Sequence, residues 1–295
     1  MGNELIYLEN DSLKIAISKR GGELQSVYHK KDGTEYLWQA DPTYWGSKAP
    51  NLFPYIGRLT GGEYLYQGKR YPMEKHGFVR PRDMSVEIST NEMAVFSIGD
   101  TEELRKMYPF AFRFLLQYRL NGRMLQIILT VENRDTRTMY FAVGGHPGFN
   151  VPLDKGVAFE DYYLEFSEEC DPKQVLFSKD CFVTGEEIEY PLEDRKRLRL
   201  RHDLFDPDAL VLKNVAKSVT LKTGPGKHEI TVQYPDMNYI GFWHKPNSDA
   251  PFLCIEPWSS LCAQQDVVTD LETQSDLISL EAGKNYENRW SISFK

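Results

Sequence analysis

Cysteine is scarce in this 295-residue chain, whose four cysteines are Cys170, Cys181, Cys254 and Cys262. They are too few and too widely spaced for a disulfide framework, and no Cys-x-x-Cys pair suggests a zinc or redox site. The first residues lack the apolar core of a secretion signal, and no stretch approaches the length of a membrane span. These absences predict a protein of the reducing cytoplasm that has no membrane partner.

An excess of positive charge is also missing. The chain has 35 Lys and Arg against 43 Asp and Glu, a formal net charge of −8. Neutralising phosphates requires a basic face, so we expect no nucleic-acid partner. The P-loop, HExxH, GxSxG and GxGxxG motifs do not occur. Because nucleotide-binding motifs and metal-ligand spacings are both lacking, the sequence predicts no cofactor and no metal.

Aromatic residues and strand-like patterns are abundant. The chain has 17 Tyr, 16 Phe and 5 Trp, which favours strands and a surface that stacks on sugars or bases. Polar and apolar residues alternate with a period of two at residues 13–18, 84–89, 229–234 and 289–294. Helix signals are few. Thr101 before two glutamates is typical of the N-cap of one short helix, and residues 266–277 could hold another turn or two.

Two hairpins can be placed from their turn residues. Asn121 and Gly122 separate two apolar runs and favour a type I′ turn, because both residue types tolerate a positive φ. Gln67 and Gly68 indicate a second hairpin. No linker or repeat divides the chain, so we predict a single all-β domain over residues 1–295, a large antiparallel β-sandwich or barrel with few short helices.

Three segments could carry chemistry. Residues 51–83 hold Arg58 and His76 in loops rich in Gly and Pro, where binding residues are often positioned. In residues 141–153, two glycines precede His146 and allow close approach to a ligand or another strand. In residues 249–266, Glu256 ends an apolar run beside Pro257 and Trp258. A partly desolvated carboxylate there would have a raised pKa, making it a better base near neutral pH.

Each of these residues has a simpler interpretation. Arg58 could form an ordinary surface ion pair, and His76 or His146 could be a turn residue without a chemical role. Glu256 could stand where a strand emerges into water. Taken together, a carboxylate, two histidines and an arginine indicate acid–base catalysis on a neutral polar substrate. A sugar suits such a site, since Trp258, Trp243 or Phe53 could stack on its apolar face.

The three segments, in this order, resemble the aldose 1-epimerase (galactose mutarotase) family. The matching blocks are "NLFPYIGR", "KHGFVR", "GHPGFN" and the glutamate of "EPWSSL". The sequence of the last block is more similar to that of the short subgroup associated with lactose utilisation than to that of the best-known galactose mutarotases. The resemblance implies a galactose mutarotase-like β-sandwich, a supersandwich, that interconverts the α and β anomers of a free aldohexose such as galactose or glucose without a cofactor.

The resemblance also implies residue roles. Glu256 would be the general base at the anomeric hydroxyl, and His146 the general acid at the ring oxygen. His76 would hydrogen-bond near that oxygen, while Arg58 and an aspartate would hold hydroxyls. Asp206 and Asp208 are both available for that role, and Asp208 is favoured because it directly precedes the expected strand "ALVLK". The mutual field of Glu256 and His146 is expected to favour both charged forms, which predicts a rate plateau around neutral pH.

A basic cluster keeps a second substrate class open. Lys69, Arg70, Lys75, Arg80 and Arg82 surround His76, and arginine recognises phosphate well. The alternatives are therefore a hexose-6-phosphate 1-epimerase, or a catalytically silent carbohydrate-binding protein on the same scaffold. A solvated basic face would explain the cluster equally well. The expected partner is a small sugar, and the expected assembly is a monomer or homodimer.

Overall fold

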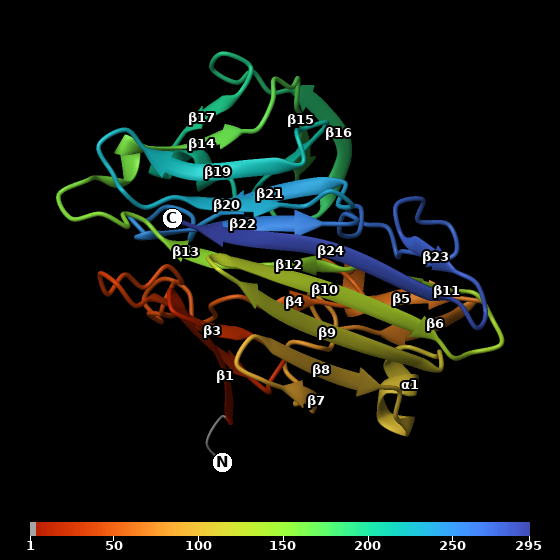
Figure 1. The fold of residues 1–295 in the computed structure, drawn as a ribbon. Coiled ribbons are helices and arrows are strands. Elements are labelled where there is room, and N and C mark those ends of the chain that lie inside the picture. Colours follow the sequence, from red (N-terminus) through yellow and green to blue (C-terminus); the bar gives the residue numbers. More distant parts are fainter. Residues whose placement is uncertain (1–3) are drawn as a thin grey trace.

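The computed structural model describes residues 4–295, which form five antiparallel sheets (Figure 1). The largest has nine strands in the order β17 (Arg197–Arg199), β14 (Tyr162–Phe166), β19 (Ser218–Thr223), β20 (Ile230–Gln233), β24 (Asn285–Phe294), β10 (Met124–Asn133), β9 (Phe112–Asn121), β8 (Met93–Gly99) and β7 (Ser85–Ser89). Strand β24, near the end of the chain, thus lies in the middle of this sheet, between β20 and β10.

A second large sheet carries the functional residues. Its order is β16 (Val183–Glu189), β15 (Lys173–Phe177), β18 (Leu210–Lys213), β21 (Tyr239–Trp243), β22 (Phe252–Trp258), β12 (Gly144–Gly145) and β4 (Asn51–Leu52), and β13 (Gly148–Asn150) also pairs with β22. This sheet packs on the nine-stranded one. A Cβ on Gly145 of β12 would lie only 2.5 Å from Trp290 of β24.

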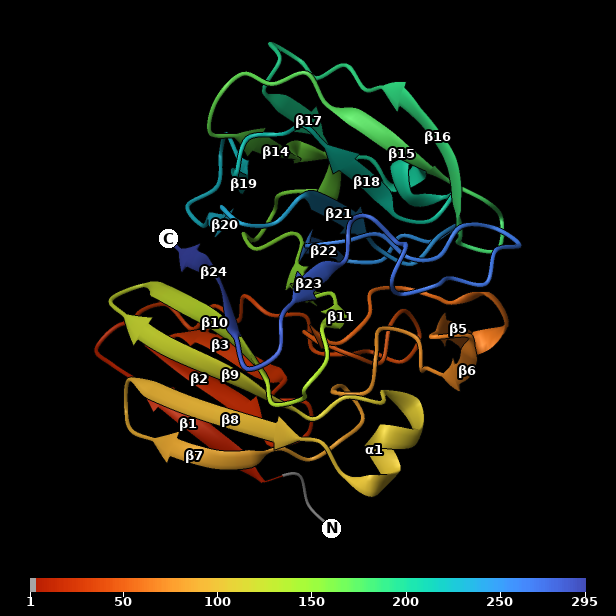
Figure 2. The same ribbon diagram turned by 90° about the vertical axis from the view of Figure 1, so that its right-hand side faces the viewer.

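Three smaller sheets and four short helices make up the rest of the secondary structure in the described residues. The sheets are β1 (Leu5–Glu9), β2 (Leu13–Ser18) and β3 (Leu24–His29); β5 (Glu63–Tyr66) and β6 (Lys69–Pro72); and β11 (Met139–Phe141) with β23 (Ile278–Leu280). Figure 2 shows β5 and β6 at one side of the molecule. The helices are α1 (Glu102–Met107) and three 3₁₀ helices, η1 (Thr60–Gly62), η2 (Phe159–Asp161) and η3 (His202–Phe205).

Strands form where the sequence alternates between polar and apolar residues. Along β9, every second side chain from Phe112 to Leu120 is buried, and the residues between them are at least partly exposed. β10 buries alternate residues in the same way over most of its length. Such alternation is the pattern of a sheet with one face in the core and the other toward solvent. The four alternating segments predicted from the sequence all lie on strands: β2, β7, β20 and β24.

The predicted short helix is confirmed as α1. Thr101 is its N-cap and accepts a hydrogen bond from the Leu104 backbone N–H at 3.1 Å. The prediction of a further helical turn in residues 266–277 is wrong, since that segment forms isolated turns instead. An all-β fold with few short helices is thus confirmed. Within residues 4–295, no helix is long and apolar enough to span a bilayer.

Both hairpins are present, but one turn differs by a residue. Gln67 and Gly68 have positive φ angles of 49° and 73°, as a type I′ turn requires. In the other hairpin, Asn121 is the last strand residue and pairs with Met124. The loop is therefore Gly122–Arg123, and only Gly122 has a positive φ. That is the pattern of a type II′ turn, so the prediction of a type I′ turn at Asn121–Gly122 is wrong.

Candidate active site

Strand register places His146 directly across from Glu256. On one side of His146, Gly144 pairs with Trp258, and on the other side Gly148 pairs with Cys254. Residues opposite each other on antiparallel strands project to the same face, with their Cβ atoms about 4.5–5.5 Å apart. His146 thus joins strands β12 and β13 beside the middle of β22, and its imidazole faces the carboxylate.

The two side chains are in contact and almost completely buried. His146 Nε2 lies 3.3 Å from Glu256 Oε2, and the side chains are 12% and 2% exposed. Strand β22 does not emerge into water at Glu256; it continues to Trp258 and is buried along its whole length. The simpler interpretation of Glu256 as a surface residue is therefore wrong.

Burial sets the protonation of this pair. It raises the pKa of Glu256 well above its ordinary value, and the negative charge of Asp208 raises it further, whereas Lys75 opposes the shift. Burial also lowers the pKa of His146 to about 3, with a smaller contribution from Lys75. The expectation that the mutual field would favour both charged forms is wrong, because both pKa shifts favour the uncharged forms. Desolvation in a closed site outweighs the attraction between the two groups.

His76 is held as a neutral hydrogen-bond donor. Its Nδ1 accepts the Gly57 backbone N–H at 3.1 Å, and its own backbone N–H donates to the Gly57 carbonyl at 2.8 Å. Burial lowers the pKa of His76 well below its ordinary value, and the positive charges of Lys75, Arg80 and Arg58 lower it further. Because Nδ1 is an acceptor, the remaining proton is on Nε2. The ring meets His146 edge-on, with ring centroids 5.5 Å apart.

Backbone strain positions His76. Its φ is +66°, in the left-handed region, and Gly77 follows at +78°. A Cβ on Gly77 would lie 2.1 Å from the Phe53 carbonyl oxygen, so only glycine fits there. The "HGF" block thus has a physical basis, because the glycine lets the loop pass close to Phe53 while the histidine turns inward.

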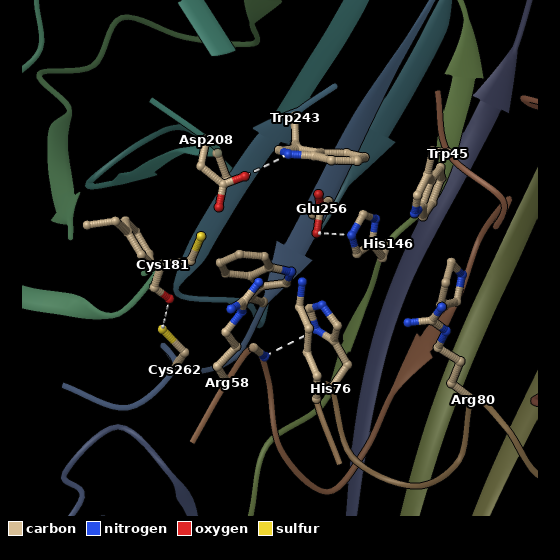
Figure 3. Close-up of a pocket in the computed structure, with 16 residues that line it drawn as sticks. Trp45, Arg58, His76, Arg80, His146, Cys181, Asp208, Trp243, Glu256 and Cys262 are labelled. Carbon is tan, nitrogen blue, oxygen red and sulfur yellow. Dashed lines mark hydrogen bonds and ion pairs between the residues drawn. The ribbon is translucent and has the colours of Figure 1, made fainter. Parts of the chain in front are cut away.

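One cavity of about 290 Å³ brings these residues together with most of the other predicted site residues. Figure 3 shows Arg58, His76, His146, Asp208 and Glu256 around it. Asp208 accepts a hydrogen bond from Trp243 Nε1 at 2.8 Å. Asp206 instead accepts the Asn247 backbone N–H at 3.0 Å and is not among the lining residues. The geometry therefore favours Asp208 over Asp206.

Aromatic side chains contribute to the lining of the cavity. Trp45, Trp243 and the buried Trp258 line it. Trp45 stacks on the His146 ring with centroids 4.9 Å apart. Phe53 is fully buried and stacks on Phe114 of β9 in the core. The suggestion that Phe53 stacks on a sugar is therefore wrong, because its ring serves the packing between the sheets.

The basic cluster divides into two groups. Lys75 and Arg80 line the cavity together with Arg58. Arg82 lies elsewhere, with bonds to Glu74 Oε1 at 2.9 Å and the Phe78 carbonyl at 3.0 Å. Arg70 pairs with Glu63 on the β5–β6 hairpin, which also carries Lys69. Only Lys75 and Arg80 of the predicted cluster can thus meet a ligand in this cavity.

Sequence reasoning missed several lining residues. Nothing in the sequence indicates that Trp45 lines the cavity, beyond its position in a loop with Gly and Pro. Cys181 and Cys262 also line the cavity. Burial raises the pKa of the Cys181 thiol to about 11, and a hydrogen bond with Asp208 contributes, so the thiol is not activated as a nucleophile. His146, Cys254 and Glu256 offer three potential metal-ligand atoms within 4.8 Å of one another.

A family model and a curated relative match almost the whole chain. The sequence model described as "Aldose 1-epimerase" matches residues 4–293. The plasmid-encoded protein LacX of Lactococcus lactis subsp. lactis is 34% identical over 292 residues, which cover 95% of this chain and 96% of LacX.

Two solved structures are similar over almost their whole length. A galactose mutarotase related enzyme from Lactobacillus acidophilus has a TM-score of 0.94 at 35% identity, covering 99% of this chain and 97% of that one. A galactose mutarotase-like protein from Lactobacillus casei has a TM-score of 0.92 at 33% identity, covering 99% and 100%. The family model and these relatives show that the chain belongs to the aldose 1-epimerase family.

Proposed function

We propose that the protein interconverts the α and β anomers of a free aldohexose such as galactose or glucose. The observation that carries the proposal is the buried contact of 3.3 Å between His146 and Glu256, in a cavity that also contains a neutral His76. Binding alone does not require a matched acid and base, whereas opening a sugar ring does.

The reaction uses both groups in ring opening and again, with their roles reversed, in ring closure. In the ionised form of the pair, Glu256 accepts the proton of the anomeric hydroxyl, and His146 Nε2 gives its proton to the ring oxygen. The C1–O5 bond breaks, and the sugar becomes an open-chain aldehyde. Rotation about C1–C2 presents the other face of the carbonyl, and reclosure with the roles reversed gives the other anomer. No proton, electron or group is gained or lost overall, so the reaction needs no redox or group-carrying cofactor.

The surrounding residues bind and orient the sugar. His76 Nε2–H donates near the ring oxygen, which fits its fixed tautomer. Arg58 and Asp208 hold hydroxyl groups, and Trp258 supports the apolar face of the sugar. Trp243 acts through Asp208, because its indole N–H donates to one carboxylate oxygen at 2.8 Å.

We also propose that the protein works in the reducing cytoplasm, since its four cysteines are free.

A hexose-6-phosphate is a second candidate substrate, because Arg58, Lys75 and Arg80 line the cavity. Within residues 4–295, none of the three lies within ion-pair distance of an Asp or Glu. Arg80 Nη2 donates to the Ser47 hydroxyl at 3.1 Å. Cations without a carboxylate partner would suit a phosphate group on the substrate.

The test is to follow the equilibration of freshly dissolved α-galactose, α-glucose and α-glucose 6-phosphate by polarimetry, with and without protein. Acceleration of the free sugars supports the proposal. Acceleration of the phosphate ester alone would favour the second candidate, and no acceleration of any sugar would favour a silent binding protein.

Two arginine variants sharpen the choice of substrate. Under the second candidate, Arg80→Gln raises KM for glucose 6-phosphate by at least about tenfold and leaves KM for glucose nearly unchanged, since one charge-assisted hydrogen bond contributes about 1.5–3 kcal/mol. Arg82→Gln is the matched control, because Arg82 belongs to the same segment but bonds to Glu74 and Phe78 outside the cavity.

A further inference from the structure

A second cluster of histidine and carboxylate side chains lies apart from the catalytic cavity. It consists of His29 at the end of β3, Asp32 in the following turn, and His228 just before β20. Asp32 and His228 line a pocket that shares no residue with the cavity around Glu256. The cluster therefore has no part in the proposed ring opening.

The polar atoms of the cluster lie close together around Asp32. Asp32 Oδ1 lies 2.7 Å from His29 Nδ1, and Asp32 Oδ2 lies 3.0 Å from His228 Nε2. One ligand atom from each of the three residues lies within 4.8 Å of the other two. Ligand atoms around a tetrahedral Zn²⁺, each about 2.0–2.1 Å from the metal, are roughly 3.3 Å apart. The two His–Asp distances are shorter than this spacing, so Asp32 would move away from both imidazoles to admit an ion.

We propose that His29, Asp32 and His228 bind one divalent transition-metal ion, for which Zn²⁺ is the best match. Two imidazoles and one carboxylate suit Zn²⁺, whereas Ca²⁺ and Mg²⁺ prefer oxygen ligands throughout. The Thr34 hydroxyl, 3.1 Å from His228 Nε2, or a water molecule completes the coordination. The site lies outside the ring-opening machinery, so it stands independently of the proposed function.

Asp154 orients one of the ligands. Its Oδ1 lies 2.7 Å from His228 Nδ1. The same carboxylate accepts the backbone N–H of Lys227 at 3.2 Å and the Tyr162 hydroxyl at 3.2 Å, which hold it in place. A carboxylate on the far nitrogen of a histidine is the usual outer shell of a metal site, because it fixes the tautomer and the ring orientation. His228 Nε2 is then the nitrogen that faces the ion.

The turn that carries the other two ligands is also fixed. The His29 backbone N–H donates to the Thr34 carbonyl at 2.8 Å, and the Gly33 N–H donates to the His29 carbonyl at 3.0 Å. The His29 side chain is 4% exposed and that of Asp32 is 43% exposed. One ligand is thus rigidly packed, while the other leaves a path for the ion to enter. An ion here would tie the three-stranded N-terminal sheet to the turn before β20, which suits a structural site.

The experiment is calorimetric titration of the chelator-treated full-length chain with zinc sulfate. We expect one ion per chain, and we expect Asp32→Asn and His228→Gln each to weaken binding by at least about a hundredfold. Asp154→Asn should weaken it by about ten- to a hundredfold, as is usual for outer-shell partners. The matched control is His202→Gln, another partly buried histidine near a carboxylate, 3.7 Å from Glu160, and it should bind zinc as the wild type does.

Either of two results would overturn the proposal. One is a wild-type chain that binds no zinc or keeps its affinity in both Asp32→Asn and His228→Gln. The other is binding that His146→Gln abolishes, which would place the ion at His146, Cys254 and Glu256 instead. If His228→Gln does not fold, the isosteric change in the partly exposed Asp32 decides the question, together with anomalous X-ray scattering at the zinc edge from wild-type crystals.

Discussion

At the scale of single residues, burial of the His146–Glu256 pair lowers the stability of the fold but gives the two groups the pKa values that the proposed reaction uses. Burial raises the pKa of Glu256 and lowers that of His146, so the proton that the two groups share is favoured on the carboxyl. Moving that proton across the 3.3 Å contact to His146 Nε2 produces the ionised pair that the proposed reaction uses. The number of bound protons does not change, so the step needs no exchange with solvent.

Replacing the carboxyl should therefore slow the reaction and stabilise the fold. Glu256→Gln is expected to reduce the rate of mutarotation by about 10²–10⁴-fold, the usual contribution of a general base. Because the folded-state pKa of Glu256 is raised, the folded chain binds more protons than the unfolded chain above the ordinary glutamate pKa. Stability is then lost as pH rises. The glutamine variant escapes this loss, so its Tm advantage over the wild type should be larger at pH 8 than at pH 5.

The control for this prediction is Glu281→Gln, which changes an exposed carboxyl in the same way. It should leave both rate and Tm nearly unchanged at either pH. A Tm advantage of Glu256→Gln that is equal at pH 5 and pH 8 would contradict a raised pKa. A rate loss of less than about tenfold would remove Glu256 from the role of base.

The pH dependence of the rate tests the imidazole separately. Because burial lowers the pKa of His146 to about 3, acid should not add a second proton to the pair until far below the ordinary histidine value near 6.5. We expect kcat/KM to stay level from neutral pH down to about pH 5, with the loss at lower pH. Polarimetric rates at constant ionic strength measure this profile. An acid limb centred near pH 6.5 would mean that the His146 ring titrates as if exposed to water.

The sequence could predict these residues because each stands beside an unusual local pattern. His76 precedes a glycine, His146 follows two, and Glu256 ends an apolar run before a proline. Trp45 could not be predicted, since its stacking on His146 depends on a contact between segments about a hundred residues apart. The position of Phe53 cannot be predicted either, because an apolar residue in a loop does not reveal whether it faces the core or the cavity.

At the scale of elements, the site depends on two short strands that flank His146. The glycines of β12 are needed because neighbouring groups come very close. A Cβ would lie 2.9 Å from the Pro257 carbonyl oxygen at Gly144 and 2.5 Å from the Trp290 ring at Gly145. The sequence indicated close approach at these glycines but not what approaches them, because the register with β22 and the packing on β24 are long-range contacts.

Gly145→Ala should therefore damage both the fold and the site. Trp290 is buried, so its ring cannot move aside freely. We expect a loss of about 1–3 kcal/mol in the free energy of unfolding, as for other overpacked positions. We also expect a fall in kcat, because His146 is the next residue. Urea denaturation and polarimetry measure the two effects.

Gly224→Ala is the matched control for this substitution. A Cβ at Gly224 would meet nothing within 4 Å, and its φ is not positive. The free energy of unfolding should change by no more than about 0.5 kcal/mol. Equal effects of the two substitutions would show that the closeness of Trp290 does not limit residue 145.

At the scale of the whole molecule, alternation of polar and apolar residues was enough to predict an all-β fold, but not the order of its strands. β24 comes last in the chain, yet it lies between β20 and β10 (Figure 1). Nothing local in residues 285–294 indicates either neighbour, because pairing between distant strands depends on packing across the whole sheet. The same limit applies to β12 and β13, which are too short to show a period of two.

The position of β24 argues that residues 1–295 unfold as one domain. Ile292 is fully buried and pairs with Leu125 of β10 on one side and Val232 of β20 on the other. Separating the two halves of the nine-stranded sheet would remove β24 from one of its partners. We therefore expect a single calorimetric transition whose calorimetric and van't Hoff enthalpies agree.

A substitution in β24 makes this prediction sharper. Ile292→Ala should cost about 2–5 kcal/mol, as large-to-small changes in a core do. Because both halves of the sheet depend on β24, the whole transition should move to lower temperature without splitting. If scanning calorimetry of the wild type or of Ile292→Ala resolves two transitions, the strands on either side of β24 unfold separately, and the chain has more than one cooperative unit.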